Sequence, residues 1–397
     1  MDLDDARTIG RRVRQIRKSR AKSLVVIAGL AGMSKSQLDR IERGEVALDR
    51  LSEIVALANA LQVAPGDLMR LPLPAPINGH SDSAIDEVRL ALVAVSRRRP
   101  GGQVVPVEVL RERVRAVQDA LHECRQAELA SALPGLIRDV HTSLAAGRDV
   151  AELLDVAVLL HAQTVSHWLR IAGAPLDLRR ENDVTLGYQL AERRDTPTAL
   201  GLVACRSTRV LLDSGAFELA RADLAVVEVP TTTAESTQLA GALALSQAWA
   251  AAASSHRADA EAAVEHAAEL AARTGEGTAY GLGFGPTNVG LWQMEAMLEI
   301  GDHELVTALA KNLNPNAHPY LSRRSAYWRD YGRALARVPG RHNDAVIALH
   351  RAEQIHPHRV QRDPFAREVL AELLLCSRPG TVSWELRGMA YRAGLPV

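Results

Sequence analysis

Residues 24–44 have the pattern of two short helices joined by a turn that contains Gly32. The first segment has an apolar face at helical spacing, formed by Leu24, Ile27, Ala28 and Leu30. Ser34 stands where an N-cap is expected, because its hydroxyl can accept a hydrogen bond from the free amides of the next turn. Leu38 and Ile41 are then expected to face the first helix, and Gly44 to end the second. This pattern predicts a helix-turn-helix, whose second helix enters the major groove of DNA.

Polar side chains cover the outer face of the second helix, and its N-terminal residues are the ones such a helix points at base edges. Gln37 can donate to and accept from adenine, while Lys35 or Arg40 can donate to the two acceptors of guanine. Ser36 can contact either base. Arg43, at the end of the helix, is better placed for a phosphate. The sequence therefore predicts direct reading of bases by this helix.

The segment before it is strongly basic. Residues 7–22 contain eight basic side chains and no acidic ones. Ile9, Val13 and Ile16 form an apolar stripe at helical spacing, so most of the arginines are expected to face outward, where they attract phosphates regardless of base sequence. We predict that the residues in contact with DNA are Arg11, Arg14, Ser34, Lys35, Ser36, Gln37, Arg40 and Arg43.

Residues from about 8 to 70 resemble the Cro/C1-type (XRE) helix-turn-helix domain. The matching motifs are IGRRVRQIR, LVVIAGLAGMSKSQLDRIERG and LDRLSEIVALANALQVAPGDLM. The resemblance implies five helices and a structural ion pair between Glu42 and Arg17. It also implies base contacts from Lys35, Ser36, Gln37 and Arg40. The chain departs from many members at two positions. Leu24 replaces a glutamine that contacts phosphate, and Asp39 stands where a serine is common.

The composition favours an all-helical protein. The chain has 397 residues, of which 47% are hydrophobic and only 4% aromatic, and strand-like alternation is scarce. Its net charge of zero argues against a general coat for nucleic acids. Cys124, Cys205 and Cys376 are too far apart for a zinc ribbon or a disulfide framework, which favours a reducing cytoplasm. The XRE resemblance implies a bacterial protein that lies on the nucleoid when bound to DNA. The sequence shows no signal segment and no apolar run long enough to span a membrane, and we predict no metal site and no cofactor.

Composition shifts divide the chain into three parts. We expect a helix-turn-helix domain in residues 1–71, a linker carrying one helix in residues 72–106, and a helical domain in residues 107–397. Pro134 is expected to separate a helix over 107–131 from one over 134–146. Several later neighbours read as helical hairpins, and residues 327–357 resemble a tetratricopeptide (TPR) unit. Stacked helix pairs of this TPR-like kind form an α-superhelix with a concave face for peptides, small ligands or a partner subunit.

Residues 278–302 crowd glycines and Pro286 ahead of an amphipathic segment. A dinucleotide site is rejected because no strand precedes the GLGFG string. The FGPTNV string resembles the C-terminal region of actinobacterial XRE regulators with TPR-like domains, which implies a helical domain that dimerises and senses a signal. Most of the few aromatic residues gather near this loop, as in ligand pockets. The candidate ligand-binding residues are Gln247, Trp249, Tyr280, Phe284, Asn288, Trp292, Trp328 and Tyr331.

The sequence is compatible with two functions and disfavours a third. The first is a sequence-specific transcriptional regulator that binds a double-stranded DNA operator as a homodimer and responds to a small-molecule or peptide effector. The second is a TPR-type interaction scaffold whose helix-turn-helix docks protein through an apolar patch formed by Leu24, Val25 and Val26. An enzyme is disfavoured, because the chain contains no nucleophile elbow, P-loop, HExxH motif or paired-carboxylate motif. We predict the first of these functions, the transcriptional regulator.

Overall fold

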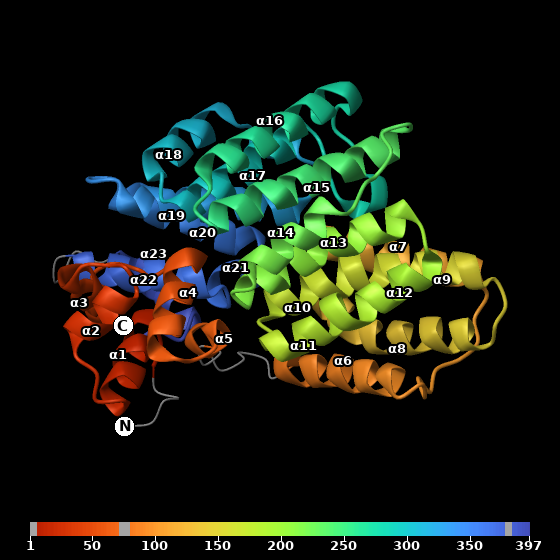
Figure 1. Cartoon of the computed structure of the whole chain (residues 1–397), viewed down its shortest axis with the longest axis horizontal. Coiled ribbons are helices and arrows are strands. Elements are labelled where there is room, and N and C mark those ends of the chain that lie inside the picture. Colours follow the sequence, from red (N-terminus) through yellow and green to blue (C-terminus); the bar gives the residue numbers. More distant parts are fainter. Residues whose placement is uncertain (1–5, 71–79, 378–382) are drawn as a thin grey trace.

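The computed structural model describes residues 6–70, 80–377 and 383–397, and over these ranges the chain is helical without strands. The N-terminal domain lies beside the C-terminal helices at one end of an elongated molecule (Figure 1). The expected all-helical fold is confirmed. Of the linker expected over residues 72–106, residues 72–79 lie outside the described ranges. None of the described helices combines the length and the apolar character that crossing a bilayer requires.

Five helices form the N-terminal domain, as the resemblance implied. They are α1 (Ile9–Ser19), α2 (Leu24–Leu30), α3 (Lys35–Arg43), α4 (Leu51–Leu61) and α5 (Pro65–Met69). Ser34 caps α3, since its Oγ accepts from the Gln37 amide at 3.1 Å, and Gly44 ends it with a left-handed φ of 77°. Arg17 donates to both carboxylate oxygens of Glu42 at 2.6 and 2.7 Å. The capping rules and the implied ion pair are therefore confirmed.

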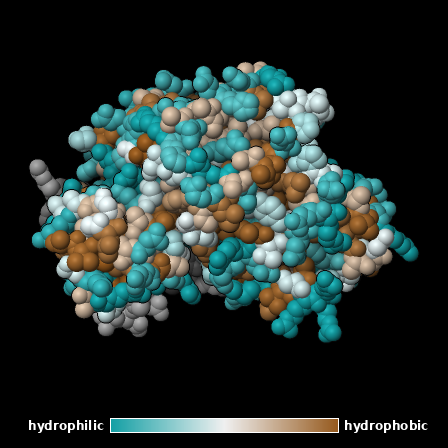
Figure 2. All heavy atoms as spheres, viewed as in Figure 1, coloured by the Kyte–Doolittle hydropathy of each residue, from teal (hydrophilic) through white to brown (hydrophobic). Residues whose placement is uncertain are grey.

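The expected apolar face of α2 is only partly correct. Ile27 and Ala28 are buried, but Leu30 is 67% exposed. Residues of a helix rotate by about 100° per position, so Leu30 lies about 120° away from Leu24 and leaves the buried face. Val25 and Val26 are also exposed, at 61% and 47%. Apolar surface is visible over the N-terminal domain in Figure 2.

The next three helices are α6 (His80–Ser96), α7 (Val107–His122) and α8 (Gln126–Ala145). The prediction that Pro134 separates two helices is wrong, because Pro134 lies buried inside α8. The break falls instead at Cys124, which has a φ of 62°, and the Arg125 amide closes α7 by donating to the Ala120 carbonyl at 2.8 Å. α8 packs against α6 and α7. This packing outweighs the one backbone hydrogen bond that a proline removes.

Two runs of continuous helix each contain a wider π-helical segment. The first comprises α9 (Val150–Leu159), η2 (Leu160–Val165) and α10 (Ser166–Ala172), and the second comprises α11 (Leu176–Arg180), η3 (Glu181–Leu186) and α12 (Gly187–Arg194). A buried polar network joins the two π-turns, because Asn182 Oδ1 lies 2.7 Å from His161 Nδ1 and Ser166 donates to Asp183 at 2.8 Å. Such turns are frequent at functional sites.

The remaining helices stack largely as antiparallel pairs, most closely α15 with α16 and α19 with α20 (Figure 1). They are α13 (Pro197–Asp213), α14 (Phe217–Ala225), α15 (Ala234–Ala253), α16 (Arg257–Thr274), η4 (Ala279–Gly281), α17 (Pro286–Ile300), α18 (His303–Asn312), η5 (Pro315–Ala317), α19 (Leu321–Arg337), α20 (His342–Ile355), α21 (His358–Gln361), α22 (Pro364–Cys376) and α23 (Trp384–Arg392). At Gly332 in α19, a Cβ atom would lie 2.8 Å from Leu349 Cγ. The TPR-like pattern of small residues thus marks a close helix contact.

Gly241 in α15 provides a test of the packing. A Cβ atom there would lie 2.0 Å from Phe284 Cζ, whose ring is fully buried. Gly241→Ala is expected to lower the free energy of unfolding by about 1–3 kcal/mol in urea denaturation, because the ring must move. Gly135→Ala in α8 is the control, since a Cβ atom there meets nothing within 4 Å and alanine favours the helix. Equal stabilisation by both changes would contradict this packing.

Polar contacts fix the N-terminal domain to the C-terminal helices. Arg337 in α19 donates to Asp49 at 3.0 Å and to Glu372 in α22 at 2.6 Å. Glu368, also in α22, accepts from the Leu48 amide at 3.3 Å, and Glu299 at the end of α17 accepts from the Ser52 amide at 2.9 Å. Because these groups are buried or nearly so, we infer that their contacts hold the N-terminal domain in one orientation against the C-terminal helices.

Candidate nucleic-acid interface and buried cavity

The outer face of α3 carries the predicted base-reading residues. Lys35, Ser36 and Arg40 are exposed. Lys35 forms no ion pair within the described structure, and Arg40 Nε lies 3.8 Å from Glu45 Oε2, so that pair is loose. Short hydrogen bonds to guanine or phosphate can replace such a contact. These three side chains are therefore available to a ligand in front of the helix.

Three other predicted contact residues already have partners inside the domain. The Ser34 hydroxyl caps α3. Gln37 donates its side-chain amide to Glu53 in α4 at 3.1 Å, which leaves its carbonyl oxygen to accept from a base. Arg43 pairs with Asp39 at 3.1 Å and with Glu45 at 3.2 Å. The two acidic residues thus compensate the charge at the C-terminal end of α3.

The two predicted arginines of α1 lie in different surroundings. Arg14 is exposed. Arg11 is exposed as well, but it lines a groove between α1 and the C-terminal part of the chain, together with Leu375 and Pro396. Arg14 therefore remains open to solvent, whereas Arg11 faces the C-terminal helices.

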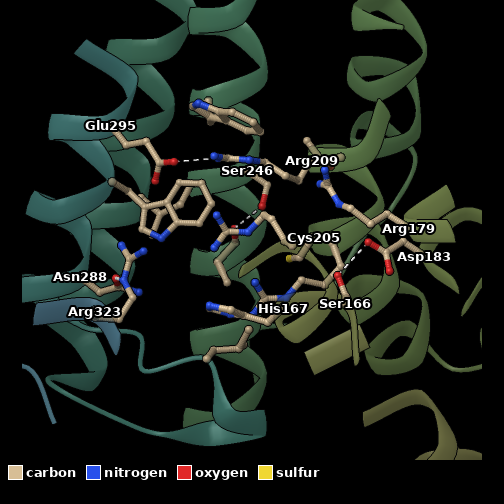
Figure 3. A pocket seen from close by; sticks show the side chains of 18 of the residues that line it. Ser166, His167, Arg179, Asp183, Cys205, Arg209, Ser246, Asn288, Glu295 and Arg323 are labelled. Atoms are coloured by element: carbon tan, nitrogen blue, oxygen red, sulfur yellow. Dashed lines mark hydrogen bonds and ion pairs between the residues drawn. The ribbon is translucent and has the colours of Figure 1, made fainter. Parts of the chain in front are cut away.

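A cavity lies within the helical domain, among side chains from α10, α11, η3, α13, α15, α17, α19 and α21 (Figure 3). It contains about 80 Å³ of space that water-sized molecules can occupy. Three of the predicted ligand-binding residues, Trp249, Asn288 and Trp292, line it. The two tryptophans form an apolar part of the wall. The Asn288 side-chain oxygen accepts a hydrogen bond from Arg323 Nε at 2.9 Å.

The other five predicted ligand-binding residues do not line this cavity. Gln247 is exposed and donates to the Leu224 carbonyl at 3.4 Å, and Phe284 is a core residue packed against α15. Tyr280 is half-buried in η4 with a φ of 53°. Trp328 and Tyr331 pack with Tyr327, at ring centroid distances of 5.0 and 5.9 Å from it. The structure therefore does not bring the eight residues into one site.

The main chemical feature of the cavity is its arginines, which were not predicted as ligand-binding residues. The residues concerned are Arg170, Arg179, Arg206, Arg209, Arg323, Arg329 and Arg359. An arginine on the face of a helix that is expected to be buried is the local signal that could have pointed to this cavity. Within the described residues, no three His, Cys, Asp or Glu side chains come together to hold a metal ion.

The geometry of α2, α3 and their caps defines a helix-turn-helix protein. In agreement, residues 8–71 match the family described as "Helix-turn-helix domain". The N-terminal domain of this chain is a helix-turn-helix domain, followed by a helical, repeat-like region.

Comparison with curated proteins finds no match. Among solved structures, the chain is similar to ComR from S. thermophilus, described in complex with DNA and its signalling peptide ComS. The two chains are 14% identical, and the comparison covers 93% of this chain and 99% of ComR with a TM-score of 0.29.

Proposed function

We propose that this protein is a sequence-specific transcriptional regulator that binds an operator as a homodimer and responds to a ligand in its helical domain. The observation that carries the proposal is the exposed face of α3 in a helix-turn-helix domain, where Lys35, Ser36 and Arg40 are free to meet base edges. The basic surface of α1 supplies attraction for phosphates. Two copies would place their α3 helices about one DNA turn apart, roughly 34 Å.

A single pair of variants tests the assigned roles. Arg40→Ala is expected to weaken operator binding by about 1–3 kcal/mol and to relax the base preference at one position. Arg14→Ala is expected to weaken binding to operator and random duplex alike, and to reduce the salt dependence by about one phosphate contact. The measurement is the selection of bound sequences from a random duplex pool, followed by titration at two salt concentrations. Equal losses for both variants on both duplexes would contradict these roles.

The second candidate function is an interaction scaffold, and the exposed apolar side chains of α2 favour it. Val25, Val26 and Leu30 form a patch of the kind that binds protein. The same selection experiment separates the two proposals. A two-fold symmetric consensus with steep salt dependence supports the regulator, whereas no enrichment supports protein docking through α2.

A further inference from the structure

The cavity in the helical domain contains more positive than negative side chains. Seven arginines line it, against two carboxylates, Asp183 and Glu295. Three of the arginines have acidic partners. Arg179 pairs with Asp213 and Arg209 with Glu295, both at 2.7 Å, while Arg329 contacts Asp330 at 2.8 Å and Asp363 at 3.1 Å.

The other four arginines, Arg170, Arg206, Arg323 and Arg359, form no ion pair with any carboxylate in the described parts of the chain. Three of them make hydrogen bonds only to neutral groups: Arg206 to Gln163 at 2.5 Å, Arg323 to Asn288 at 2.9 Å and Arg359 to His167 at 3.4 Å. His167 is neutral, because burial lowers its pKa well below the usual value.

Two of these guanidinium groups also have a donor without an acceptor. The Nε–H groups of Arg206 and Arg359 are buried and make no hydrogen bond, and Arg359 as a whole is only 3% exposed. A buried donor without a partner and a buried cation without a counter-charge are both unfavourable. The cavity therefore keeps an excess of positive charge, which nearby carboxylates such as Asp183, Glu295 and Asp330 offset only in part.

The acid–base properties of the cluster agree with this imbalance. Burial, and then the charges of neighbouring arginines, lower the pKa of Arg170 well below its ordinary value. For the same two reasons the pKa of Arg359 falls to about 10, and burial lowers that of Arg323 to about 10. A bound anion would reverse these effects.

We infer that the cavity binds a small polyanion, with two or more phosphate or carboxylate groups, between Arg170, Arg206, Arg323 and Arg359. A free space of only about 80 Å³ suits a compact ion rather than a peptide chain. Planar guanidinium groups suit both phosphate and carboxylate. Ser166 and Ser246 also line the wall (Figure 3), but their hydroxyls already donate to Asp183 and to the Ala242 carbonyl, so the arginines are the donors for the anion.

Two helices connect this cavity to the DNA-binding domain, which gives the ligand a regulatory role that rests on the proposed function. In α19, Arg329 lies in the cavity, Asp330 contacts both Arg329 and Arg333, and Arg333 donates to the Asp49 carbonyl at 2.9 Å. In α17, Glu295 lies in the cavity and Glu299, one turn later, accepts from the Ser52 amide. A ligand that changes the position of either helix changes the contacts of the N-terminal domain.

Binding of defined ions to the full chain tests the site without DNA. Diphosphate and citrate are titrated by calorimetry and thermal unfolding, with chloride and acetate at equal ionic strength as references. We expect saturable binding and a rise in Tm for at least one polyanion, and the two arms distinguish phosphate from carboxylate ligands. No saturable binding of either polyanion, or equal effects of chloride, would overturn the inference.

Arg206→Gln separates a binding role from a structural one. The variant is expected to weaken polyanion binding about tenfold or more, equivalent to about 1.4 kcal/mol, while the Tm of the ion-free protein stays the same or rises because repulsion is relieved. A structural arginine would lower the ion-free Tm. Arg257→Gln, on an exposed ion pair outside the cavity, is the matched control and is expected to bind like the unchanged protein. Unchanged polyanion binding by Arg206→Gln would overturn the inference.

The effect on DNA is measured separately. The bound ion is expected to change operator Kd by about fivefold or more, within the usual range of coupling between two sites. If polyanions bind saturably and no DNA sequence is selected with or without them, the proposed regulator fails while the anion site stands. If an operator is selected and no polyanion binds, the anion site fails while the regulator stands.

Discussion

Arg337→Ala is expected to lower the free energy of unfolding by about 3–5 kcal/mol, the range for removing one partner of a buried ion pair. Arg337 donates to Asp49, to Glu372 and, at 2.8 Å, to the Ala47 carbonyl. Burial alone would raise the pKa of Asp49, but Arg337 and Arg333 hold it below its usual value. Without Arg337, Glu372 loses its ion-pair partner and Asp49 keeps only the more distant Arg333, at 3.4 Å, where the two domains meet. Urea denaturation at pH 7 measures the loss.

Arg257→Ala is the matched control for this change. Arg257 also contacts two carboxylates, Glu261 and Asp302, each at 2.8 Å, but it is half-exposed to solvent. Exposed pairs contribute little, so we expect a change of less than about 1 kcal/mol. Similar losses in the two variants would mean that burial of the Asp49 contact does not determine its strength.

Acidification from pH 7.5 to 5.5 is expected to destabilise the helical domain through His141 and His161. Their Nε2 atoms lie 2.9 Å apart, which requires at least one of these nitrogens to be unprotonated. Burial lowers the pKa of His141 to about 3, with help from His161, and that of His161 to about 4 against the bond from Asn182. The unfolded histidines take up protons below about pH 6.5, so stability is present above that pH and is lost as the pH falls toward 4.

Each histidine then contributes a loss of about 1.4 kcal/mol at pH 5.5, or about 3 kcal/mol for the pair. Asp183 acts in the opposite direction, because burial raises its pKa to about 6. The double change His141→Gln and His161→Gln keeps Asp183, so the difference between the two proteins isolates the histidines. Urea denaturation at both pH values measures it. If the double variant loses as much stability on acidification as the unchanged protein, the pair does not titrate as described.

The predicted DNA-reading residues follow from local patterns, and the structure modifies their surroundings. Ser34 and Gly44 act at the ends of α3 as expected, because caps depend on residues only a few positions apart. The bond between Gln37 and Glu53 was not foreseeable, since it joins α3 to α4. The proposed roles of Lys35, Ser36 and Arg40 stay predictions until the DNA measurements.

The cavity of the helical domain shows where local patterns stop being informative. Of the eight residues predicted near the glycine-rich loop, Trp249, Asn288 and Trp292 line the cavity and the other five do not. The arginines went unnoticed, because Arg170 and Arg359 are 189 positions apart in the chain. No spacing rule links residues so distant.

The helix-turn-helix domain and the helical character of the rest follow from the order of residues alone, since helical periodicity, caps and breakers act between residues within a few turns. The packing of the whole chain is needed to place Pro134 inside α8, Asp49 beside Arg337, and four arginines without ion-paired carboxylates in one cavity. These features join residues that are far apart in the chain. Desolvation and charge interaction depend on which helices pack together, and helix packing is a property of the whole chain.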